Sequence, residues 1–332
     1  MRVSGVLIAL MMVAFPMAFL AQTKPDNTLT VHQRPVTALP IVARIPLPKE
    51  PDWMALGFGS VWVVNYKPDR LSRVDPVTGH LLADIALGPD ACLGVVIALD
   101  RVWVATCGDG VINEIDARTN AVVRRISVPI TTGREGAFAI ANGSFWIPAN
   151  LPDASSSAVA RVDVRSGRVL SLIPVGARTD VVIAGFGAVW AASSATDTIH
   201  RINPSRNAVT ARVAVGHTPK FMAAGEGGVW VQNQADGSVS RVDPRANREV
   251  ARIEAGAPTK WGDIATGDGA VWLSVNGKPV TRIDPQTNRV THQFVGGDGA
   301  DAIRSGAGAL WVADHKHGEL WKIDFRVLRP AP

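Results

Sequence analysis

Residues 220–255 read KFMAAGEGGVWVQNQADGSVSRVDPRANREVARIEA, a stretch in which four short apolar segments alternate with turn residues. Its tryptophan belongs to a set of seven that recur about every 40 residues, each within a short apolar segment. The set comprises Trp62, Trp103, Trp146, Trp190, Trp230, Trp272 and Trp311. A repeat of this length, built from short strands, is typical of β-propellers with about four strands per blade. The sequence therefore predicts an all-β fold, a seven-bladed β-propeller of four-stranded blades.

Two kinds of turn separate the strands within each predicted blade. Residues 225–228 of the quoted stretch connect the inner strand to the second strand, and glycine there supplies positive φ readily. Residues 243–247 connect the third strand to the outer strand, with Pro244 second in the turn and Asn247 at a left-handed position. The repeated G-x-G sequences therefore belong to hairpins and open no helix, which excludes a phosphate-binding loop.

The two ends of the chain are expected to share one blade. The last blade has predicted inner, second and third strands within residues 300–325 but no outer strand after them. Residues 40–46, PIVARIP, resemble instead the outer strand at residues 249–253, EVARI. We therefore expect residues 40–48 to complete blade seven, which closes the ring and leaves no free inner edge. Residues 40–332 then form a single propeller domain.

The chain begins with a segment outside this repeat. Residues 1–21 join a basic start to an apolar run over residues 6–20, which is short for a membrane span. The pattern predicts a signal peptide cleaved after Ala21 and a periplasmic or secreted protein. The alternative is an uncleaved anchor, because Phe19 stands where signal peptidase prefers a small residue. Residues 22–39 lack periodicity, and we expect a flexible lead-in there.

The formal net charge of +5 raises the question of an anionic partner. Many arginines, however, recur at one strand position and are followed two residues later by Asp or Asn, as Arg241 is by Asp243, so we interpret them as local structural pairs. Aromatic residues are not interleaved with Lys and Arg as a single-strand nucleic-acid groove requires. We therefore expect no nucleic-acid partner, no membrane span beyond the signal segment, and a monomer. A nucleic-acid binder would show strongly salt-dependent affinity.

The two cysteines, Cys92 and Cys107, favour a disulfide in an exported chain. Predicted strands on either side of Leu99 and Asp100 form a tight hairpin that sets the cysteines opposite each other. Directly opposed residues bring Cβ atoms within disulfide range, and closing such a loop adds about 3 kcal/mol in the chain-entropy model. The alternative is a redox or metal-binding pair, although the spacing is not C-x-x-C.

Alternate connections of an up-and-down blade lie on opposite faces, so the uniform turns gather on one face and the loops of varied sequence on the other. Divergent loops around a channel mouth are where function is usually found. The inner strands also begin at this mouth, where we expect Asp52, Asp180 and the candidate ligand-binding residues. These candidates are Trp53, Arg134, Glu135, Lys220, Lys260, Trp261 and Asp301. Trp53 and Trp261 are able to stack on a ring or a sugar; the alternative is that they plug the channel or cover a neighbouring blade.

Three histidines are expected on the same variable face, and all three are candidate catalytic residues: His217, His315 and His317. The imidazoles of His315 and His317 can share one side of a strand end and act as a metal pair or as a base with a ligand. The alternative is a solvated loop. Asp263, Asp301 and Asp314 lie in the last two blades and are candidate ligands of a divalent cation, Mg²⁺ or Ca²⁺.

The G-x-V-W-V units and the turns of the type Asp284-Pro285-Gln286-Thr287-Asn288 resemble those of two groups of propellers. Residues 242–258 resemble YVTN-type repeats of exported proteins, and residues 40–325 as a whole resemble the streptogramin (virginiamycin B) lyase family, which is also seven-bladed. The second resemblance implies opening of a lactone ring by elimination, with His and Glu side chains acting beside a magnesium ion near the channel mouth. The family's W-F-T-E run reads here as Trp230-Val231-Gln232-Asn233, without the glutamate.

Two functions follow as alternatives. The first is binding of a small ligand or a protein partner at the variable-loop face of an exported propeller. The second is a metal-assisted lyase or hydrolase acting on a lactone or an ester, in which His315 or His317 is the base and a divalent ion stabilises the developing oxyanion. No Ser-His-Asp, zinc-helix or dinucleotide motif in the sequence supports another enzyme class.

Overall fold

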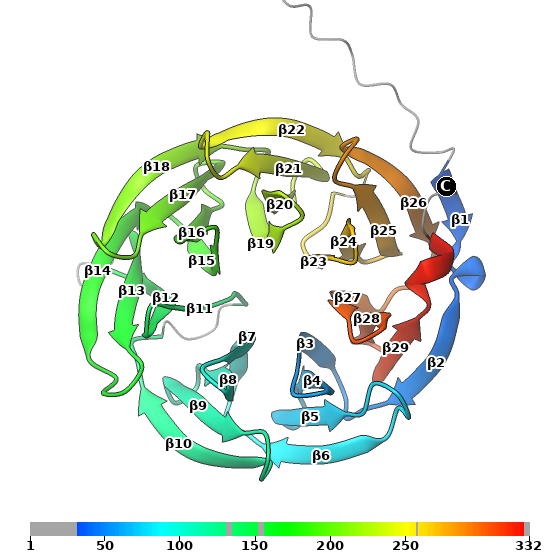
Figure 1. Cartoon of the computed structure of the whole chain (residues 1–332), viewed down its shortest axis with the longest axis horizontal. Helices are drawn as coiled ribbons and strands as arrows, with labels where there is room; N and C mark the ends of the chain where they lie inside the picture. The colour runs from blue at the N-terminus through cyan, green and yellow to red at the C-terminus, as the bar shows by residue number, and fades with distance from the viewer. Residues whose placement is uncertain (1–31, 131–134, 152–155, 257, 329–332) are drawn as a thin grey trace, which may run out of the picture.

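Seven sheets arranged in a ring make up the fold, and the four strands of each blade pair antiparallel (Figure 1). The computed structural model describes residues 32–130, 135–151, 156–256 and 258–328. The predicted signal peptide, residues 1–21, and the candidate Arg134 lie outside these ranges. Each blade has an inner, a second, a third and an outer strand that pair in this order, which confirms the predicted seven-bladed, four-stranded propeller.

Six blades take their strands in chain order. Blade one contains β3 (Pro51–Gly57), β4 (Ser60–Asn65), β5 (Arg70–Val74) and β6 (Leu81–Ala86), and blade two contains β7 (Ala91–Ala98), β8 (Arg101–Thr106), β9 (Val111–Asp116) and β10 (Ala121–Ser127). Blade three contains β11 (Ala139–Ala141), β12 (Ser144–Asn150), β13 (Ser157–Asp163) and β14 (Val169–Gly176), and blade four contains β15 (Thr179–Gly185), β16 (Ala188–Ser193), β17 (Thr198–Asn203) and β18 (Ala208–Ala214). Blade five contains β19 (Pro219–Gly225), β20 (Gly228–Asn233), β21 (Ser238–Asp243) and β22 (Arg248–Glu254), and blade six contains β23 (Asp263–Gly267), β24 (Ala270–Val275), β25 (Lys278–Asp284) and β26 (Arg289–Val295).

Blade seven combines strands from both ends of the chain. Its β27 (Ala300–Gly306), β28 (Ala309–Asp314) and β29 (Glu319–Ile323) precede a short 3₁₀ helix, η3 (Phe325–Leu328), and its outer strand is β2 (Ile41–Pro46). β2 pairs antiparallel with β29 and sets Ile45 opposite Leu320, which confirms the predicted closure. Both side chains are buried, so apolar packing as well as backbone hydrogen bonding joins the two ends.

The described part of the predicted lead-in, residues 32–39, is more regular than the flexible segment that the sequence predicts for residues 22–39, and residues 22–31 lie outside the described ranges. Gln33–Pro35 forms β1, which lies beside β26 and pairs with it in parallel as a fifth strand of blade six (Figure 1). A 3₁₀ helix, η2 (Val36–Ala38), follows, and Leu39 is buried. The sequence shows no period here because a strand of three residues is too short to display one.

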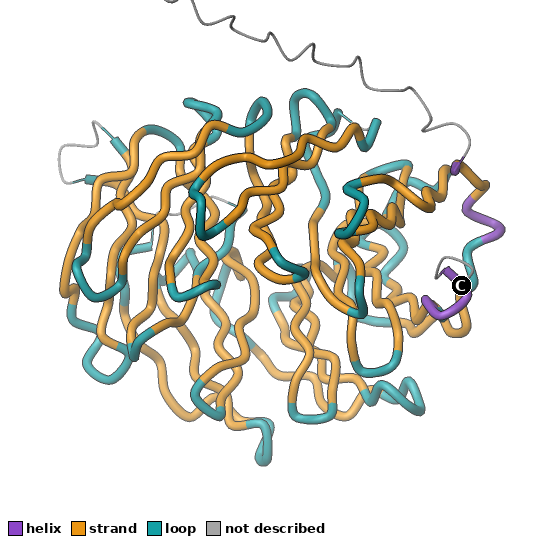
Figure 2. Tube along the Cα trace, turned by 45° about the horizontal axis from the view of Figure 1, so that its top comes forward, coloured by secondary structure: helices purple, strands orange, loops and turns teal. Residues whose placement is uncertain are grey.

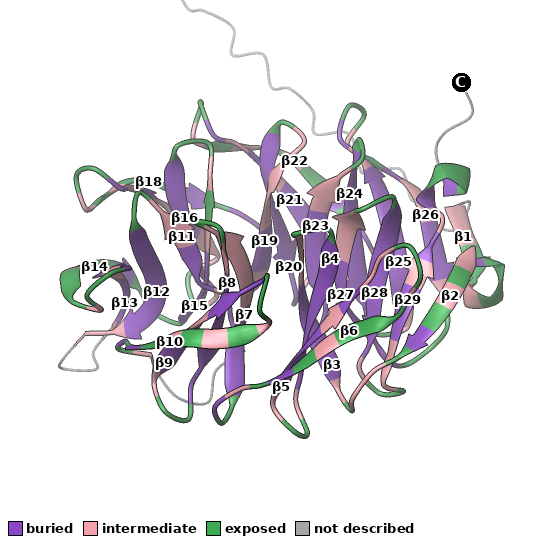
Figure 3. Ribbon diagram, turned by 60° about the horizontal axis from the view of Figure 1, so that its bottom comes forward, coloured by how far each residue is buried: buried purple, intermediate pink, exposed green. Residues whose placement is uncertain are grey.

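The second strands carry much of the core. Every residue of β4, β16, β20, β24 and β28 is buried, because both faces of a blade pack against its neighbours. Outer strands such as β10 alternate exposed with less exposed residues at the rim (Figure 3). All seven repeated tryptophans are at most 1% exposed, and each indole Nε1 donates, at 2.8–3.2 Å, to the carbonyl oxygen five residues before it.

Arg241 does not form the local pair with Asp243 that the spacing suggests. Arg241 lies over the ring of Trp230, 5.1 Å from its centroid, and donates to the carbonyl oxygen of Pro285 at 2.6 Å and to Asn288 Oδ1 at 2.9 Å. Asp243 instead accepts two backbone N–H groups of its own turn. The arginine therefore links neighbouring blades, whereas the aspartate shapes the turn.

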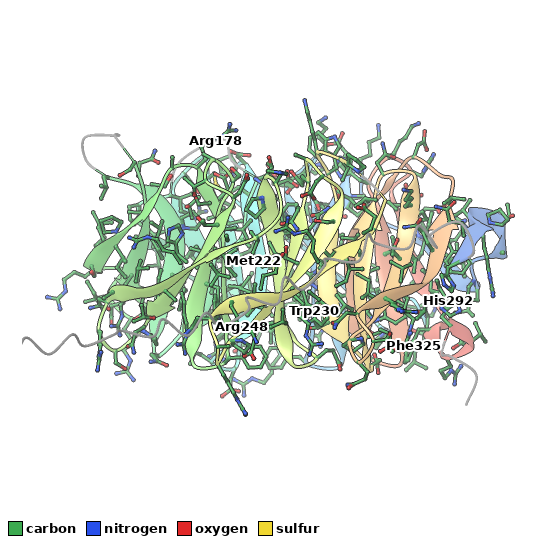
Figure 4. The ribbon with its side chains drawn as sticks, turned by 90° about the horizontal axis from the view of Figure 1, so that it is seen from above. Arg178, Met222, Trp230, Arg248, His292 and Phe325 are labelled. Carbon is green, nitrogen blue, oxygen red and sulfur yellow. A yellow bond between two sulfur atoms is a disulfide. The ribbon has the colours of Figure 1, made fainter. Side chains whose placement is uncertain are left out.

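The two faces of the ring differ in their connections (Figure 2). The inner-to-second and third-to-outer turns lie on one face, here called the turn face, and the remaining connections lie on the other, here called the loop face. Arg178, between β14 and β15, and Arg248, at the start of β22, lie toward these opposite faces (Figure 4). Among the residues that the structure describes, no helical segment has the length and apolar character of a membrane span.

Cys92 and Cys107 form the predicted disulfide, with their Cα atoms 5.8 Å apart. Near its turn the β7–β8 hairpin has the predicted register, in which Ala98 faces Arg101. The register then shifts within the stretch that contains Cys92 and Gly94, whose φ is +81°. The disulfide therefore joins β7, where its pairing is irregular, to the residue that follows β8, rather than two directly opposed strand residues.

Candidate functional site

A pocket of about 470 Å³ opens at the loop face, where inner strands of several blades begin. Its lining includes Asp52 and Tyr66 of blade one, Glu135 and Trp261 ahead of blades three and six, and Asp301 and His315 of blade seven. The side chain of Trp261 is 55% exposed. The volume suits a small molecule.

Asp52, Asp301 and His315 converge within this pocket. One potential ligand atom of each side chain lies within 4.8 Å of those of the other two. Asp52 and Asp301 are only 6% and 9% exposed. The Nδ1 atom of His315 is buried, and none of the described residues hydrogen-bonds to it. The cluster thus combines two nearly buried carboxylates with an imidazole whose Nδ1 atom has no partner among the described residues.

Irregular pairing at the starts of the inner strands determines where these side chains point. The register of β3 shifts around Asp52 and Trp53, and that of β27 shifts around Asp301 and Ala302. A β-bulge interrupts the regular alternation of side chains along a strand, and bulges are frequent beside functional sites. His315 is held from the other side, because its backbone N–H donates to the carbonyl oxygen of Gly299 at 2.7 Å.

Burial and mutual repulsion raise the pKa values of the pocket carboxyl groups. Burial first, and then the charges of Asp301 and Glu135, raise the pKa of Asp52 well above its usual range. A hydrogen bond from the Tyr66 hydroxyl opposes this rise in the Asp52 pKa. Burial also raises the pKa of Asp301, an effect that the His315 imidazole opposes. Burial, followed by the charge of Asp301, raises the pKa of Glu135 to about 7. The pocket therefore favours bound protons or a bound cation over free carboxylates.

The predicted ligand-binding lysines lie apart from this cluster. Lys220 Nζ lies 3.3 Å from Asp180 Oδ2 and donates to the carbonyl oxygen of Glu135 at 2.9 Å. The charge of Lys220 opposes the rise in the pKa of Glu135. Lys260 is exposed and does not line the pocket described above. Lys220 therefore positions the segment that carries Glu135, and Lys260 stays a predicted ligand contact without a place in the pocket.

The two candidate aromatic residues have different surroundings. Trp53 is 4% exposed, and its ring contacts that of Phe221 edge-on with centroids 5.3 Å apart. A Cβ atom on Gly94 would meet the Trp53 ring at 3.3 Å, so glycine leaves room for the indole. Because Trp53 belongs to blade one and Phe221 to blade five, this contact crosses the centre of the propeller. It agrees with the alternative interpretation of Trp53 as a plug of the channel. Trp261 lines the pocket and offers a surface for stacking.

Two of the three candidate histidines lie outside the cluster. His217 is exposed, and its Nδ1 lies 2.7 Å from Asp197 Oδ2. His317 Nδ1 lies 2.8 Å from Asp314 Oδ1, so these two candidates for the site contact each other. Their catalytic and metal-binding roles stay predictions. His315 is the candidate histidine that the structure brings to the pocket.

The remaining metal candidate, Asp263, forms an ion pair with Arg304. Asp301 thus joins the cluster without Asp263 or Asp314, and its partner carboxylate is Asp52, for which the sequence suggested a position at the mouth but no metal-binding role. A pattern in the sequence does point to Asp52. It is the second residue of its inner strand, as Asp301 is of β27.

Tyr66 was not predicted as a site residue. It is the single tyrosine of the chain, and its ring lies edge-on to that of His315 with centroids 6.2 Å apart. The residue follows β4 in a loop that resembles no other in the chain, so the repeat gives no pattern from which its role could be inferred.

Comparison with known proteins bears on the fold. No protein-family model matches the chain, and no curated protein matches it. Among solved structures, a similar chain is described as "Streptogramin B lyase structure", with a TM-score of 0.67 and 15% sequence identity over 84% of this chain and 94% of that chain. The propeller fold expected from the resemblance to streptogramin lyases is thereby confirmed, and a likeness of this kind concerns architecture rather than activity.

Proposed function

We propose that the protein binds a small molecule in the loop-face pocket, together with a divalent cation held by Asp52, Asp301 and His315. The observation that carries this proposal is His315, whose buried Nδ1 atom has no hydrogen-bond partner among the described residues and whose imidazole offers a ligand atom beside two carboxylates in a pocket. Buried polar atoms of folded proteins are nearly always hydrogen-bonded or ligated, so an unpartnered one at a pocket wall supports a binding site there.

The three donors fit a divalent cation. Carboxylate oxygens suit Mg²⁺, Ca²⁺ and Mn²⁺, and an imidazole nitrogen extends the choice to Zn²⁺ and related ions. A bound cation would also offset the repulsion that raises the pKa of Asp52. Three protein donors do not complete the coordination of these ions, which leaves positions for an oxygen of a bound ligand. A ligand with such an oxygen and a ring that stacks on Trp261 fits the pocket best.

Calorimetric titration of Mn²⁺ into chelator-treated protein tests the cation site. We expect one binding event in the wild-type protein and an affinity weakened by about tenfold or more in Asp301→Asn and His315→Gln. His217→Gln is the matched control, because His217 is an exposed histidine on the same face. Wild-type affinity in both Asp301→Asn and His315→Gln would contradict the proposed site.

The alternative function is a metal-assisted lyase or hydrolase acting on a lactone or an ester. Its support is the fold similarity to a streptogramin B lyase together with the position of His315. In this alternative the His315 imidazole would accept a proton from a bound substrate, and Glu135, with a pKa of about 7, would donate one to a leaving group near neutral pH. A divalent cation held by Asp52 and Asp301 would supply a Lewis acid for a developing oxyanion.

Turnover of macrocyclic lactones and simple esters, measured with and without added Mg²⁺, tests this alternative. We expect His315→Gln to lose turnover and His217→Gln to retain it. Unchanged turnover in His315→Gln would contradict its role as the base. A protein that binds the cation but turns over none of these compounds would retain ligand binding as the proposed function.

We also propose that the protein acts outside the cytoplasm, in the periplasm or the extracellular medium. The Cys92–Cys107 disulfide supports this location, because disulfides persist mainly in oxidising compartments. The apolar run at residues 6–20 of the sequence fits the same proposal. Detection of the protein in periplasmic or culture fractions, with a processed N-terminus, is the measurement that tests it.

A further inference from the structure

Three of the inner-to-second turns on the turn face carry a large apolar side chain. Phe58, Leu99 and Phe186 are 41%, 55% and 44% exposed. They occupy equivalent positions in the turns between the inner and second strands of blades one, two and four. Each has a left-handed backbone, with φ values of 52°, 52° and 53°. These residues are therefore both exposed and held in a conformation that large side chains rarely adopt.

Other blades show which residues suit this turn position. Blade three has Asn142 with φ 49° and blade six has Asp268 with φ 54°, whereas blades five and seven have Glu226 with φ 47° and Ala307 with φ 49°. Asn and Asp adopt the left-handed region more readily than Phe or Leu do. The strained apolar residues consequently contribute neither to turn stability nor to a buried core. Strain that is kept at exposed positions points to a role beyond folding.

The same face carries exposed arginines. Three stand in the turns between third and outer strands, and three more stand at or next to the starts of outer strands: Arg165, Arg206, Arg245, Arg168, Arg248 and Arg289. Within the described ranges, no ion pair joins any of these six to another side chain. Asp163 and Asp243 lie close by, but their carboxylates accept backbone hydrogen bonds of their own turns. The guanidinium groups can therefore bind external anions.

We propose that the turn face binds an anionic lipid surface. Phe58, Leu99 and Phe186 insert at the level of the headgroups, and the six arginines contact lipid phosphates. A lipid surface satisfies both sets of residues at once, because it combines phosphates with an apolar layer. A duplex nucleic acid would offer phosphates to the arginines but no apolar layer to the other three. In this orientation the loop-face pocket stays open to solvent, so the proposal does not depend on the ligand of that pocket.

Co-sedimentation with vesicles tests this proposal. The described strands complete all seven blades from residue 33 onward, so the protein lacking residues 1–21 is suitable. We expect it to sediment with phosphatidylglycerol-containing vesicles, less so at high salt, and not with pure phosphatidylcholine vesicles. The triple variant Arg165→Ser, Arg206→Ser and Arg245→Ser should bind about fivefold more weakly for each arginine removed.

Phe58→Asn and Phe186→Asn test the apolar contribution without harming the fold, because asparagine occupies the equivalent turn position in blade three. We expect weaker vesicle binding together with an unchanged or higher Tm. Arg178→Asn is the control on the loop face, since Arg178 is exposed and has φ 53°, and it should bind vesicles as the wild-type protein does.

Absence of binding to anionic vesicles, or wild-type binding in the turn-face variants, would overturn the proposal. Equal binding to duplex DNA, insensitive to the two Phe substitutions, would assign the face to nucleic acid instead.

Discussion

At the scale of single residues, the contact that recurs in this propeller is a basic side chain that lies over the ring of a tryptophan. Arg241 lies over Trp230 in blade five, and an Arg or Lys lies over the equivalent tryptophan in blades one, three, four, six and seven. In blade two, Glu114 faces Trp103 instead. Glu114 binds Arg124, which donates to carbonyl oxygens of the turn in blade three. A basic side chain thus reaches the next blade even where the repeat is broken.

Arg241→Ala should lower the free energy of unfolding by about 2 kcal/mol, because it removes two hydrogen bonds between blades and a cation–π contact. Arg245→Ala removes an exposed arginine four residues further along the chain and should change the free energy of unfolding by less than about 0.5 kcal/mol. Urea unfolding followed by tryptophan fluorescence measures both. Equal losses in the two variants would contradict the linking role of Arg241.

The pKa of Glu135 predicts how stability depends on pH. Folding raises this pKa from its ordinary value of 4.5 to about 7, first through burial. Between pH 4.5 and about pH 7 the folded protein retains a proton that the unfolded chain has released. The free energy of unfolding should therefore fall as the pH rises through this range. The loss is on the order of 2–3 kcal/mol. Glu135→Gln should flatten this part of the profile and be the more stable protein above pH 7, as thermal unfolding across pH would show. A wild-type profile in the variant would contradict the assignment.

Single-residue roles could be predicted from the sequence where the repeat imposes them, as for the buried Trp230. The sequence could not show that Arg241 bonds to Pro285, 44 residues away, because only the packing of blades brings them together. The same holds for the site. Asp52 and Asp301 lie near opposite ends of the chain and become neighbours because blade seven closes against blade one.

At the scale of elements, the inner strands were predictable and their bulges were not. Apolar periodicity and turn residues determine where β3 and β27 run, but a shift of register leaves no mark in the composition of a short strand. These shifts place Asp52 and Asp301 at the pocket. The β7–β8 hairpin behaves in the same way, since its register was predicted correctly near the turn and incorrectly near Cys92.

Replacement of both cysteines, Cys92→Ser with Cys107→Ser, should lower the free energy of unfolding by about 3 kcal/mol. The disulfide closes a loop with a sequence separation of 15, which restricts the unfolded chain. Mn²⁺ binding should persist in this variant, because Cys92 lines the pocket but is not part of the Asp52 cluster. Denaturant unfolding with and without reductant measures the effect. A free energy of unfolding that changes with neither the substitution nor the reductant would contradict the stabilising role of the disulfide.

At the scale of the whole molecule, the ring depends on one strand from the beginning of the chain. Removal of all residues before Pro48 deletes β2 and leaves β29 as an unpaired edge, so we expect association or loss of the folded monomer. Removal of residues before Pro40 deletes β1 and η2 but keeps β2, and should leave a monomer. Light scattering coupled to size-exclusion chromatography distinguishes the two. A folded monomer without β2 would contradict the role of closure.

The architecture of the whole molecule was the most predictable feature, because each of the seven repeats predicts the same four-stranded blade. The site was the least predictable, because it lies where the repeats differ and where blades one and seven meet. His315 was identified from a histidine pair, yet its partners proved to be Asp52 and Asp301 rather than His317.

The most direct test of the proposed cation site is the anomalous difference density of crystals soaked in Mn²⁺. We predict a peak between Asp52, Asp301 and His315 in the loop-face pocket, and its loss in Asp301→Asn crystals of the same form. A peak elsewhere with this cluster empty, or a peak that persists unchanged in the variant, would contradict the central claim.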